Sequence, residues 1–283
     1  MSGIETGVVA TEIGMEVARR RNSFRPLFRK LRHHIRHGHL RIAIFGPGGA
    51  GKTTLGRFLS GAAPIDNDDG NYRESYGIER FRLKGDVICS LLVAPGQERR
   101  IEGRADLYQR LTSGKAAAII NVVSYGYESF SELSYTQTTL YQEVAQAVAP
   151  RQPILADFLP HYFAQRRRQE QAYLEELAQW LKTAKKKIWM ITLVTKEDLW
   201  WDQQNTVRAH YETGAYNQVI QDVISARGRE NFPHEYLYAS LVIGRMLTNR
   251  DEVLAENVAG YDQYIQRAQQ QRLLEALLSY VGK

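Results

Sequence analysis

The chain has little cysteine, no long apolar run and, between Val17 and Ile65, no acidic residue. Its single cysteine, Cys89, has no partner among the 283 residues, so an internal disulfide is excluded and a reducing compartment fits. No apolar stretch reaches the ~18 residues that a membrane-spanning helix needs. The first residues do not read as a secretory signal either. We therefore expect a soluble, cytoplasmic protein.

The positive charge of the chain is concentrated near its beginning. Residues 1–65 hold 11 Lys or Arg and 3 acidic residues, a surplus of eight, whereas the whole chain carries a net charge of +6. The remaining residues, with 26 basic and 28 acidic side chains, therefore sum to −2. The basicity belongs to an N-terminal arm, residues 1–38, rather than to the whole protein.

An amphipathic helix is predicted inside this arm from about Ser23. Apolar side chains recur there at helical spacing, with arginines on the other faces. The residues of this stripe are Phe24, Leu27, Phe28, Leu31 and Ile35. Three interpretations stay open: the stripe packs on the core and the arginines are solvated, the helix contacts an anionic membrane or a partner protein, or it contacts nucleic acid.

The most informative stretch is residues 40–54. A short apolar strand ending at Phe45 is followed, from Gly46 to Thr53, by the spacing G-x-x-x-x-G-K-T of the phosphate-binding loop. Glycines let the backbone turn so that its N–H groups point at phosphate oxygens. Lys52 brings a mobile cation toward the β and γ phosphates, and Thr53 offers a hydroxyl to Mg²⁺. The residues predicted to bind the nucleotide here are Gly46, Gly48, Gly49, Ala50, Gly51, Lys52, Thr53 and Thr54.

Beyond this loop, apolar strands alternate with amphipathic helices. Strands at about 77–83 and 87–93 predict an antiparallel hairpin at one edge of a sheet. Further strands are predicted at 116–123, just before Thr195, and just before Ala239. Helices are predicted at about 52–59, 163–183, 200–227 and 253–280. We therefore expect an α/β protein with the three-layer fold of P-loop nucleoside triphosphatases, a mostly parallel sheet and a basic N-terminal helical arm.

One long segment, residues 124–160, interrupts this alternation. It is rich in Ser, Thr and Tyr, and its middle, 136–148, predicts a short helix before Pro150 and Pro153 break the pattern. Insertions beside a nucleotide site often recognise a partner. The segment is either such a partner-recognition element or a flap without a partner of its own.

Three motifs in order resemble the motif set of the Ras-like small GTPases, over roughly residues 39–283. They are the phosphate-binding loop, then Pro95-Gly96-Gln97-Glu98, then Thr195-Lys196-Glu197-Asp198. The resemblance implies that the backbone of Gly96 contacts the γ phosphate and that Gln97 orients the attacking water, with Lys52 as the second catalytic residue.

The same resemblance implies how the purine base is recognised. Guanine would be recognised by Thr195, Lys196 and Asp198. The Asp198 carboxylate would accept two hydrogen bonds from the guanine edge while Lys196 packs over the ring. Ala239 and Ser240 match the last base-contacting element in part. Ser75, before the first hairpin strand, is similar in place to the second Mg²⁺-binding hydroxyl.

Two departures from the family pattern affect the expected hydrolysis. Val93 stands where most relatives carry an Asp that holds Mg²⁺ through water, so hydrolysis should be slow. The stretch Val93 to Gln97 is similar to the bacterial gliding-motility polarity GTPases. Arg73, Arg99 and Arg100 are either candidates for a transition-state arginine or ordinary exposed charges.

The sequence therefore predicts a guanine-nucleotide switch that binds GTP and Mg²⁺ and hydrolyses GTP slowly to GDP. Expected partners are an effector or activator at residues 62–80, 94–105 and the 124–160 insertion, with a membrane or protein contact by the arm. Two alternatives stay open. One is a GTP-binding interaction protein with little hydrolysis, and the other is an ATP-dependent P-loop phosphotransferase, which needs Lys52 and Thr53 equally.

Overall fold

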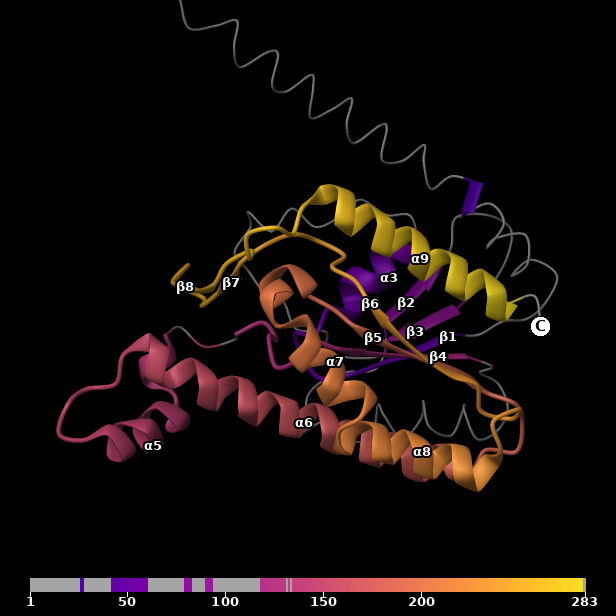
Figure 1. Ribbon diagram of the computed structural model, residues 1–283, viewed down its shortest axis with the longest axis horizontal. Helices are drawn as coiled ribbons and strands as arrows, with labels where there is room; N and C mark the ends of the chain where they lie inside the picture. Colours follow the sequence, from indigo (N-terminus) through magenta and orange to yellow (C-terminus); the bar gives the residue numbers. More distant parts are fainter. Residues whose placement is uncertain are drawn as a thin grey trace, which may run out of the picture.

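A six-stranded sheet forms the centre of the computed structural model (Figure 1), which describes residues 26–27, 42–60, 79–82, 90–93, 118–130, 132 and 134–281. Its strands are β1 (Ile42–Phe45), β2 (Glu79–Arg82), β3 (Ser90–Val93), β4 (Ala118–Val123), β5 (Trp189–Val194) and β6 (His234–Tyr238). The strand order is β2-β3-β1-β4-β5-β6. Only β2 runs antiparallel to its neighbour in this sheet, so the predicted edge hairpin and parallel centre are confirmed.

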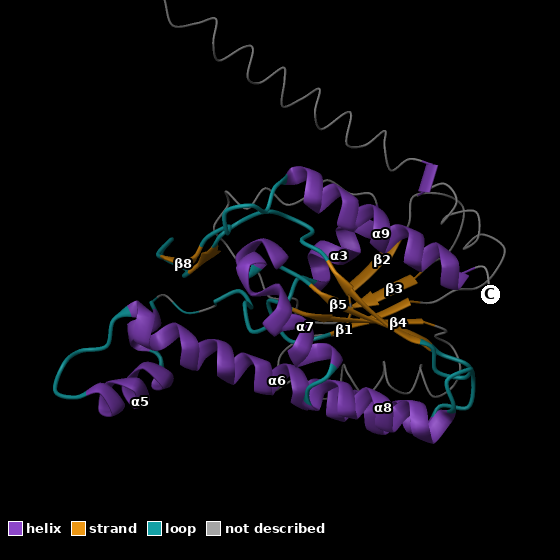
Figure 2. Cartoon of the chain, in the orientation of Figure 1, coloured by secondary structure: helices purple, strands orange, loops and turns teal. Residues whose placement is uncertain are grey.

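Helices cover both faces of the sheet, as Figure 2 shows. The helices are α3 (Lys52–Ser60), α5 (Thr139–Val148), α6 (Leu155–Thr183), α7 (Gln204–Glu212), α8 (Ala215–Arg227) and α9 (Gln263–Val281). Apolar residues of α3 and α9 pack on one face, and those of α6, α7 and α8 pack on the other. The predicted three-layer α/β architecture is therefore confirmed.

Alternating side chains of β1 belong to two different apolar clusters, one on each face of the sheet. Ile42 and Ile44 join the cluster that α3 and α9 cover, whereas Ala43 and Phe45 join the cluster under α6 and α8. Every residue of β1, β4 and β5 is buried. Continuous apolar strands of this kind are typical of a parallel sheet covered on both faces.

The helix predicted at 163–183 begins earlier, at Leu155, and contains Pro160. Pro160 lies in the second turn, where the missing N–H removes a single helical hydrogen bond. Asp157 supports the start of the helix, since its carboxylate accepts from the backbone N–H of Ile154 at 2.9 Å and pairs with Arg151 at 2.6 Å. The short helix predicted at 136–148 is confirmed as α5, preceded by a 3₁₀ turn at Tyr135–Gln137.

Two further helix predictions were wrong in their extent. The segment 200–227 is divided into a 3₁₀ turn, α7 and α8, with a break at Thr213 and Gly214. The segment 253–280 begins as a strand, β8 (Val253–Ala255), paired with β7 (Met246–Leu247). The helix α9 starts only after Asp262, whose carboxylate accepts from the backbone N–H groups of residues 264 and 265 and caps the helix.

Several predictions fall outside the described residues. They concern most of the arm, the loops 62–78 and 94–105, and the residues Arg73, Ser75, Cys89, Gly96, Gln97, Arg99 and Arg100. Of the arm's apolar stripe, Leu27 is described, and it packs against the core under α3 and α9. None of the helices in the described ranges is both long and apolar enough to span a membrane.

Candidate functional site

The phosphate-binding loop lies between the end of β1 and the start of α3, as its sequence predicts. At Gly46 the backbone angle φ is +131°, and a Cβ atom there would lie 2.0 Å from the carbonyl oxygen of Val122 on β4. A side chain is therefore excluded at this position both by conformation and by space. The loop can pass this close to the central strands only because residue 46 is glycine.

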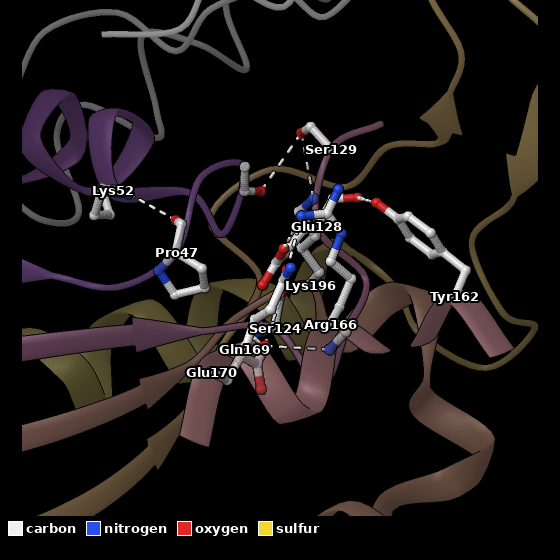
Figure 3. A network of polar contacts seen from close by, with 12 residues as sticks. Pro47, Lys52, Ser124, Glu128, Ser129, Tyr162, Arg166, Gln169, Glu170 and Lys196 are labelled. Carbon is white, nitrogen blue, oxygen red and sulfur yellow. Dashed lines mark hydrogen bonds and ion pairs between the residues drawn. The ribbon is translucent and has the colours of Figure 1, made fainter. Parts of the chain in front are cut away.

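The ammonium group of Lys52 is held inside this loop. Lys52 is 8% exposed, and its Nζ donates a hydrogen bond of 2.6 Å to the carbonyl oxygen of Pro47 (Figure 3). An anion at the N-terminus of α3 would meet both this cation and the positive end of the helix. The donor set therefore fits a phosphate group.

The predicted base-recognition segment is joined directly to the phosphate-binding loop. The hydroxyl of Thr195, just after β5, donates to the carbonyl oxygen of Ala50 at 2.7 Å and lies 3.0 Å from that of Val123. Lys196 follows in the left-handed conformation, with φ of 58°. The chain therefore turns sharply at the end of β5 and keeps residues 195–198 beside the loop.

Asp198 and Ser240, which the sequence resemblance assigned to base recognition, are in contact. The Ser240 hydroxyl donates to the Asp198 carboxylate and accepts from the Asp198 backbone N–H at 2.9 Å. The other carboxylate oxygen accepts from the backbone N–H of Gly244 at 3.0 Å. Burial raises the pKa of Asp198, while the hydrogen bonds from Ser240 and Gly244 oppose that shift. The backbone N–H of Ala239 instead donates to Val194, which extends the pairing of β5 and β6.

A second segment, residues 124–130, lies against the phosphate-binding loop. The backbone N–H of Ser129 donates to the carbonyl oxygen of Gly49 at 3.2 Å, and Lys196 donates to the Ser129 hydroxyl at 3.4 Å. A Cβ atom on Gly49, where φ is +80°, would lie 2.5 Å from the Ser129 nitrogen. The start of the predicted insertion, residues 124–130, therefore forms a wall beside the phosphate-binding loop (Figure 3).

Glu170 on α6 holds this wall in place. One of its carboxylate oxygens accepts from the backbone N–H groups of Ser124 and Gly126, at 2.8 and 3.2 Å. The other accepts from the Tyr211 hydroxyl at 2.6 Å. Burial raises the pKa of Glu170, and these hydrogen bonds act in the opposite direction. Glu170 therefore acts as a buried acceptor that organises the backbone after β4.

Glu128 is equally buried but has a different environment. Among the residues that the structure describes, neither of its carboxylate oxygens accepts a hydrogen bond. Arg166 Nη1 on α6 lies 3.4 Å from Glu128 Oε2. Burial and the charge of Glu170 raise the pKa of Glu128 to about 8, against the opposing effect of Arg166. At neutral pH this carboxyl group is therefore mostly protonated.

The sequence predictions did not include Glu128, Ser129, Arg166 or Glu170. One signal was present for Glu170, which lies four residues before Leu174 and eight after Tyr162, both buried. A carboxylate on the apolar stripe of a helix must find buried donors. No comparable signal marks Glu128, because the charged residues around it come from α6 and from the turn after β5.

Of the two predicted Mg²⁺ ligands, the structure describes Thr53, at the start of α3. The described residues contain no group of three or more His, Cys, Asp or Glu side chains placed to hold a metal ion. A Mg²⁺ ion at this loop would therefore depend on hydroxyl and phosphate oxygens, which are ligands that this ion accepts.

The sheet order, the two helical layers and the loop between β1 and α3 define an α/β protein with a P-loop fold. No protein-family model matches the sequence, and no curated protein sequence matches it. The chain is similar in structure to a small COPII coat GTPase from Encephalitozoon cuniculi in complex with GDP, at 12% identity and a TM-score of 0.43, over 99% of this chain and 98% of that one.

Two other solved structures are similar to this chain at comparable identity and TM-score. For the signal recognition particle receptor SRb-GDP from Chaetomium thermophilum the identity is 14% and the TM-score 0.41, over 85% of this chain and 97% of that one. For the cytosolic domain of the T. maritima FeoB iron transporter in its GMPPNP form, the identity is 14% and the TM-score 0.36. That match covers 86% of this chain and 64% of the FeoB chain. With scores this low, the likenesses carry no conclusion about what this chain binds.

Proposed function

We propose that this chain is a Ras-like guanine-nucleotide-binding protein that binds GTP with Mg²⁺, hydrolyses it slowly to GDP, and acts as a switch. The observation that supports this most strongly is the hydrogen bond from Thr195 to Ala50. It holds Thr195, three residues before the buried Asp198, against the loop between β1 and α3. Such a pairing suits a ligand with phosphates at one end and a hydrogen-bonding base at the other.

In this proposal each described residue has a stated task. Lys52 and the backbone N–H groups of Gly46 and residues 48–54 bind the phosphates, and Thr195 keeps the base segment at the loop. Asp198 accepts from the guanine edge, for which its carboxylate oxygens keep further lone pairs beside the bonds to Ser240 and Gly244. Lys196 packs over the ring.

The hydrolytic step assigns tasks to residues outside the described ranges. Gln97 orients the attacking water, and the backbone of Gly96 donates to the γ phosphate. Thr53 and Ser75 are the residues that would hold Mg²⁺, which supplies positive charge to the phosphate oxygens. Slow turnover follows from Val93 in the place of an acidic residue.

The switch would report its nucleotide through residues 62–80 and 94–105, and through the 124–160 insertion. Within that insertion, residues 124–130 contact the phosphate-binding loop at Gly49, and α5 packs on α6. A partner bound at α5 and α6 would therefore lie on α6, whose Glu170 holds the backbone of residues 124–126, and on the helix packed against it. The arm remains the candidate contact to an anionic membrane, and the similarity of residues 93–97 to the bacterial polarity GTPases remains part of the proposal.

Substitution of Asp198 tests the proposal against an ATP-dependent phosphotransferase. Asp198→Asn should lower GDP affinity about 100-fold and raise affinity for xanthosine diphosphate, because the amide pairs with the carbonyl group that xanthine carries in place of the amine. The matched control is Asp202→Asn, an exposed carboxylate four residues on. Titration calorimetry of both variants measures the effect. Unchanged nucleotide preference in Asp198→Asn would contradict guanine recognition.

A further inference from the structure

Two buried glutamates near the phosphate-binding loop differ sharply in what they contribute to the fold. Both Glu128 and Glu170 are residues with an exposed fraction of 0%. Glu170 accepts hydrogen bonds from two backbone N–H groups and one tyrosine hydroxyl. Glu128 accepts none from the described part of the chain. The desolvation of Glu170 is therefore compensated by the fold, and that of Glu128 is not.

An uncompensated buried carboxyl group lowers stability, because water solvates it in the unfolded chain and nothing replaces those hydrogen bonds in the folded one. Its pKa of about 8 reflects the same cost, with burial as the largest cause. The contact with Arg166, 3.4 Å from Nη1 to Oε2, offsets this cost only in part, since Arg166 Nη1 also donates to Gln169 Oε1 at 3.0 Å. Residues that reduce stability in this way tend to be found where they serve binding or catalysis.

The charged residues around Glu128 indicate the group on which its carboxyl group acts. Positive charges of Arg166, Lys196 and Lys52 all lower its pKa, so all three act on it electrostatically. Lys196 donates to the hydroxyl of Ser129, the residue next to Glu128. Burial lowers the pKa of Lys196 to about 8, and the charge of Glu128 opposes that change. Figure 3 shows Glu128, Ser129 and Lys196 together, with Arg166 on the adjoining helix.

We propose that Glu128 is a positioning residue of the nucleotide site that acts through Lys196. Its carboxyl group, held by Arg166 of α6, provides an acceptor that keeps the Lys196 ammonium beside the phosphate-binding loop when the nucleotide is bound. This inference rests on the proposed function, and it deepens that function by naming what orients the lysine that packs over the base. It also makes α6 part of the site, because Arg166 and Glu170 belong to that helix.

Glu128→Leu should affect nucleotide binding more than stability. Leucine has a similar volume and removes the buried polar group, while Arg166 keeps its hydrogen bond to Gln169, so the unfolding midpoint in denaturant should fall much less than in Glu170→Leu. Nucleotide affinity should nevertheless fall about tenfold, because Lys196 loses its acceptor. Glu128→Gln should keep wild-type affinity within about twofold at pH 7, since an amide oxygen accepts as the protonated carboxyl does.

A double-mutant cycle identifies the residue through which Glu128 acts. The dissociation constant for GDP is measured for wild type, Glu128→Leu, Lys196→Met and the double variant. In the Lys196→Met background, the Glu128→Leu substitution should change affinity less than twofold. Equal losses in both backgrounds, or wild-type affinity in Glu128→Leu, would overturn the proposal, and so would a loss of stability in Glu128→Leu comparable to that of Glu170→Leu.

The control for the cycle is Glu143→Leu on α5, an exposed position outside the site. It should leave GDP affinity unchanged in both backgrounds. Failure of the proposed function has a separate signature: the wild-type protein itself would then not bind GDP. If wild type binds GDP and the cycle shows no coupling between residues 128 and 196, the role proposed for Glu128 is wrong. The proposed function is not contradicted by that result.

Discussion

The hydroxyl of Thr195 donates a 2.7 Å hydrogen bond to the carbonyl oxygen of Ala50, across 145 positions of sequence. Thr195 is 2% exposed and Ala50 is fully buried, so water does not compete for this bond. It connects the end of β5 to the loop between β1 and α3. The two segments that the sequence marks as nucleotide contacts are therefore held as one unit.

Replacing Thr195 by valine should separate these two segments. The variant keeps the shape of the side chain but leaves the Ala50 carbonyl oxygen without its donor, so the free energy of unfolding should fall by about 1–3 kcal/mol. GDP affinity should fall about tenfold in the same variant. Thr213→Val is the control, because the exposed Thr213 hydroxyl, at the C-terminal end of α7, donates to the carbonyl oxygen of Ala209 four residues earlier. Chemical denaturation and calorimetry measure the two effects, and equal behaviour of the two variants would refute the link.

Gly49 and Gly228 offer a matched pair for the contact between the phosphate-binding loop and residues 124–130. Both have φ of +80°, but an added Cβ at Gly49 would lie 2.5 Å from Ser129 N, whereas at Gly228 the nearest atom, of Asn231, is 3.9 Å away. Both alanine variants should lose about 1–2 kcal/mol from backbone strain. Only Gly49→Ala should also displace the loop and lose at least about tenfold in nucleotide affinity. Equal binding by both variants would show that the close approach at Gly49 does not matter for binding.

The sequence predicted the sheet and the phosphate-binding loop well because these depend on local patterns. Apolar runs such as Trp189–Val194, glycine spacing and the two strands joined by Lys84 to Asp86 need no tertiary information. Asp198 and Ser240 were each assigned to base recognition through the family resemblance, but the hydrogen bonds between them were not predicted. The place of Glu128 in the site was not predicted, because it depends on how α6 packs beside the loop. The start of α9 was missed because the capping role of Asp262 competes with apolar residues that continue a helical spacing upstream.

Glu170 should be essential for stability in a way that Glu128 is not. In Glu170→Leu the backbone N–H groups of Ser124 and Gly126 and the hydroxyl of Tyr211 lose their acceptor, so the free energy of unfolding should fall by about 2–4 kcal/mol. Glu175→Leu, at an exposed position of the same helix, should change it by less than about 0.5 kcal/mol. Urea denaturation followed by circular dichroism provides the comparison. A Glu170→Leu protein as stable as the wild type would contradict the assigned role.

His234 should make the protein less stable in mild acid. Burial lowers the pKa of His234 to about 3, below its ordinary value of 6.5, and its Nε2 lies 2.9 Å from the Thr192 hydroxyl. Below pH 6.5 the unfolded chain therefore binds a proton that the folded chain does not. This group then lowers the free energy of unfolding by about 1.4 kcal/mol for each pH unit between 6.5 and the folded pKa.

The test compares His234→Gln with the wild type between pH 7 and 5. The variant should lose about 2 kcal/mol less over the interval from pH 6.5 to 5, because glutamine does not take up the proton. His161→Gln, at an exposed position on α6, is the control and should follow the wild-type curve. Parallel curves for His234→Gln and the wild type would show that burial of His234 does not govern the acid response.

Nucleotide selectivity is the most direct test of the central claim that one site binds both a phosphate chain and a guanine base. Titration calorimetry of the full chain with GTP, GDP and ATP, with and without Mg²⁺, measures it. We expect GTP and GDP to bind at least about 100-fold more tightly than ATP, since the edge of adenine leaves the Asp198 carboxylate without matching donors. ATP binding as tight as GTP binding would contradict the account.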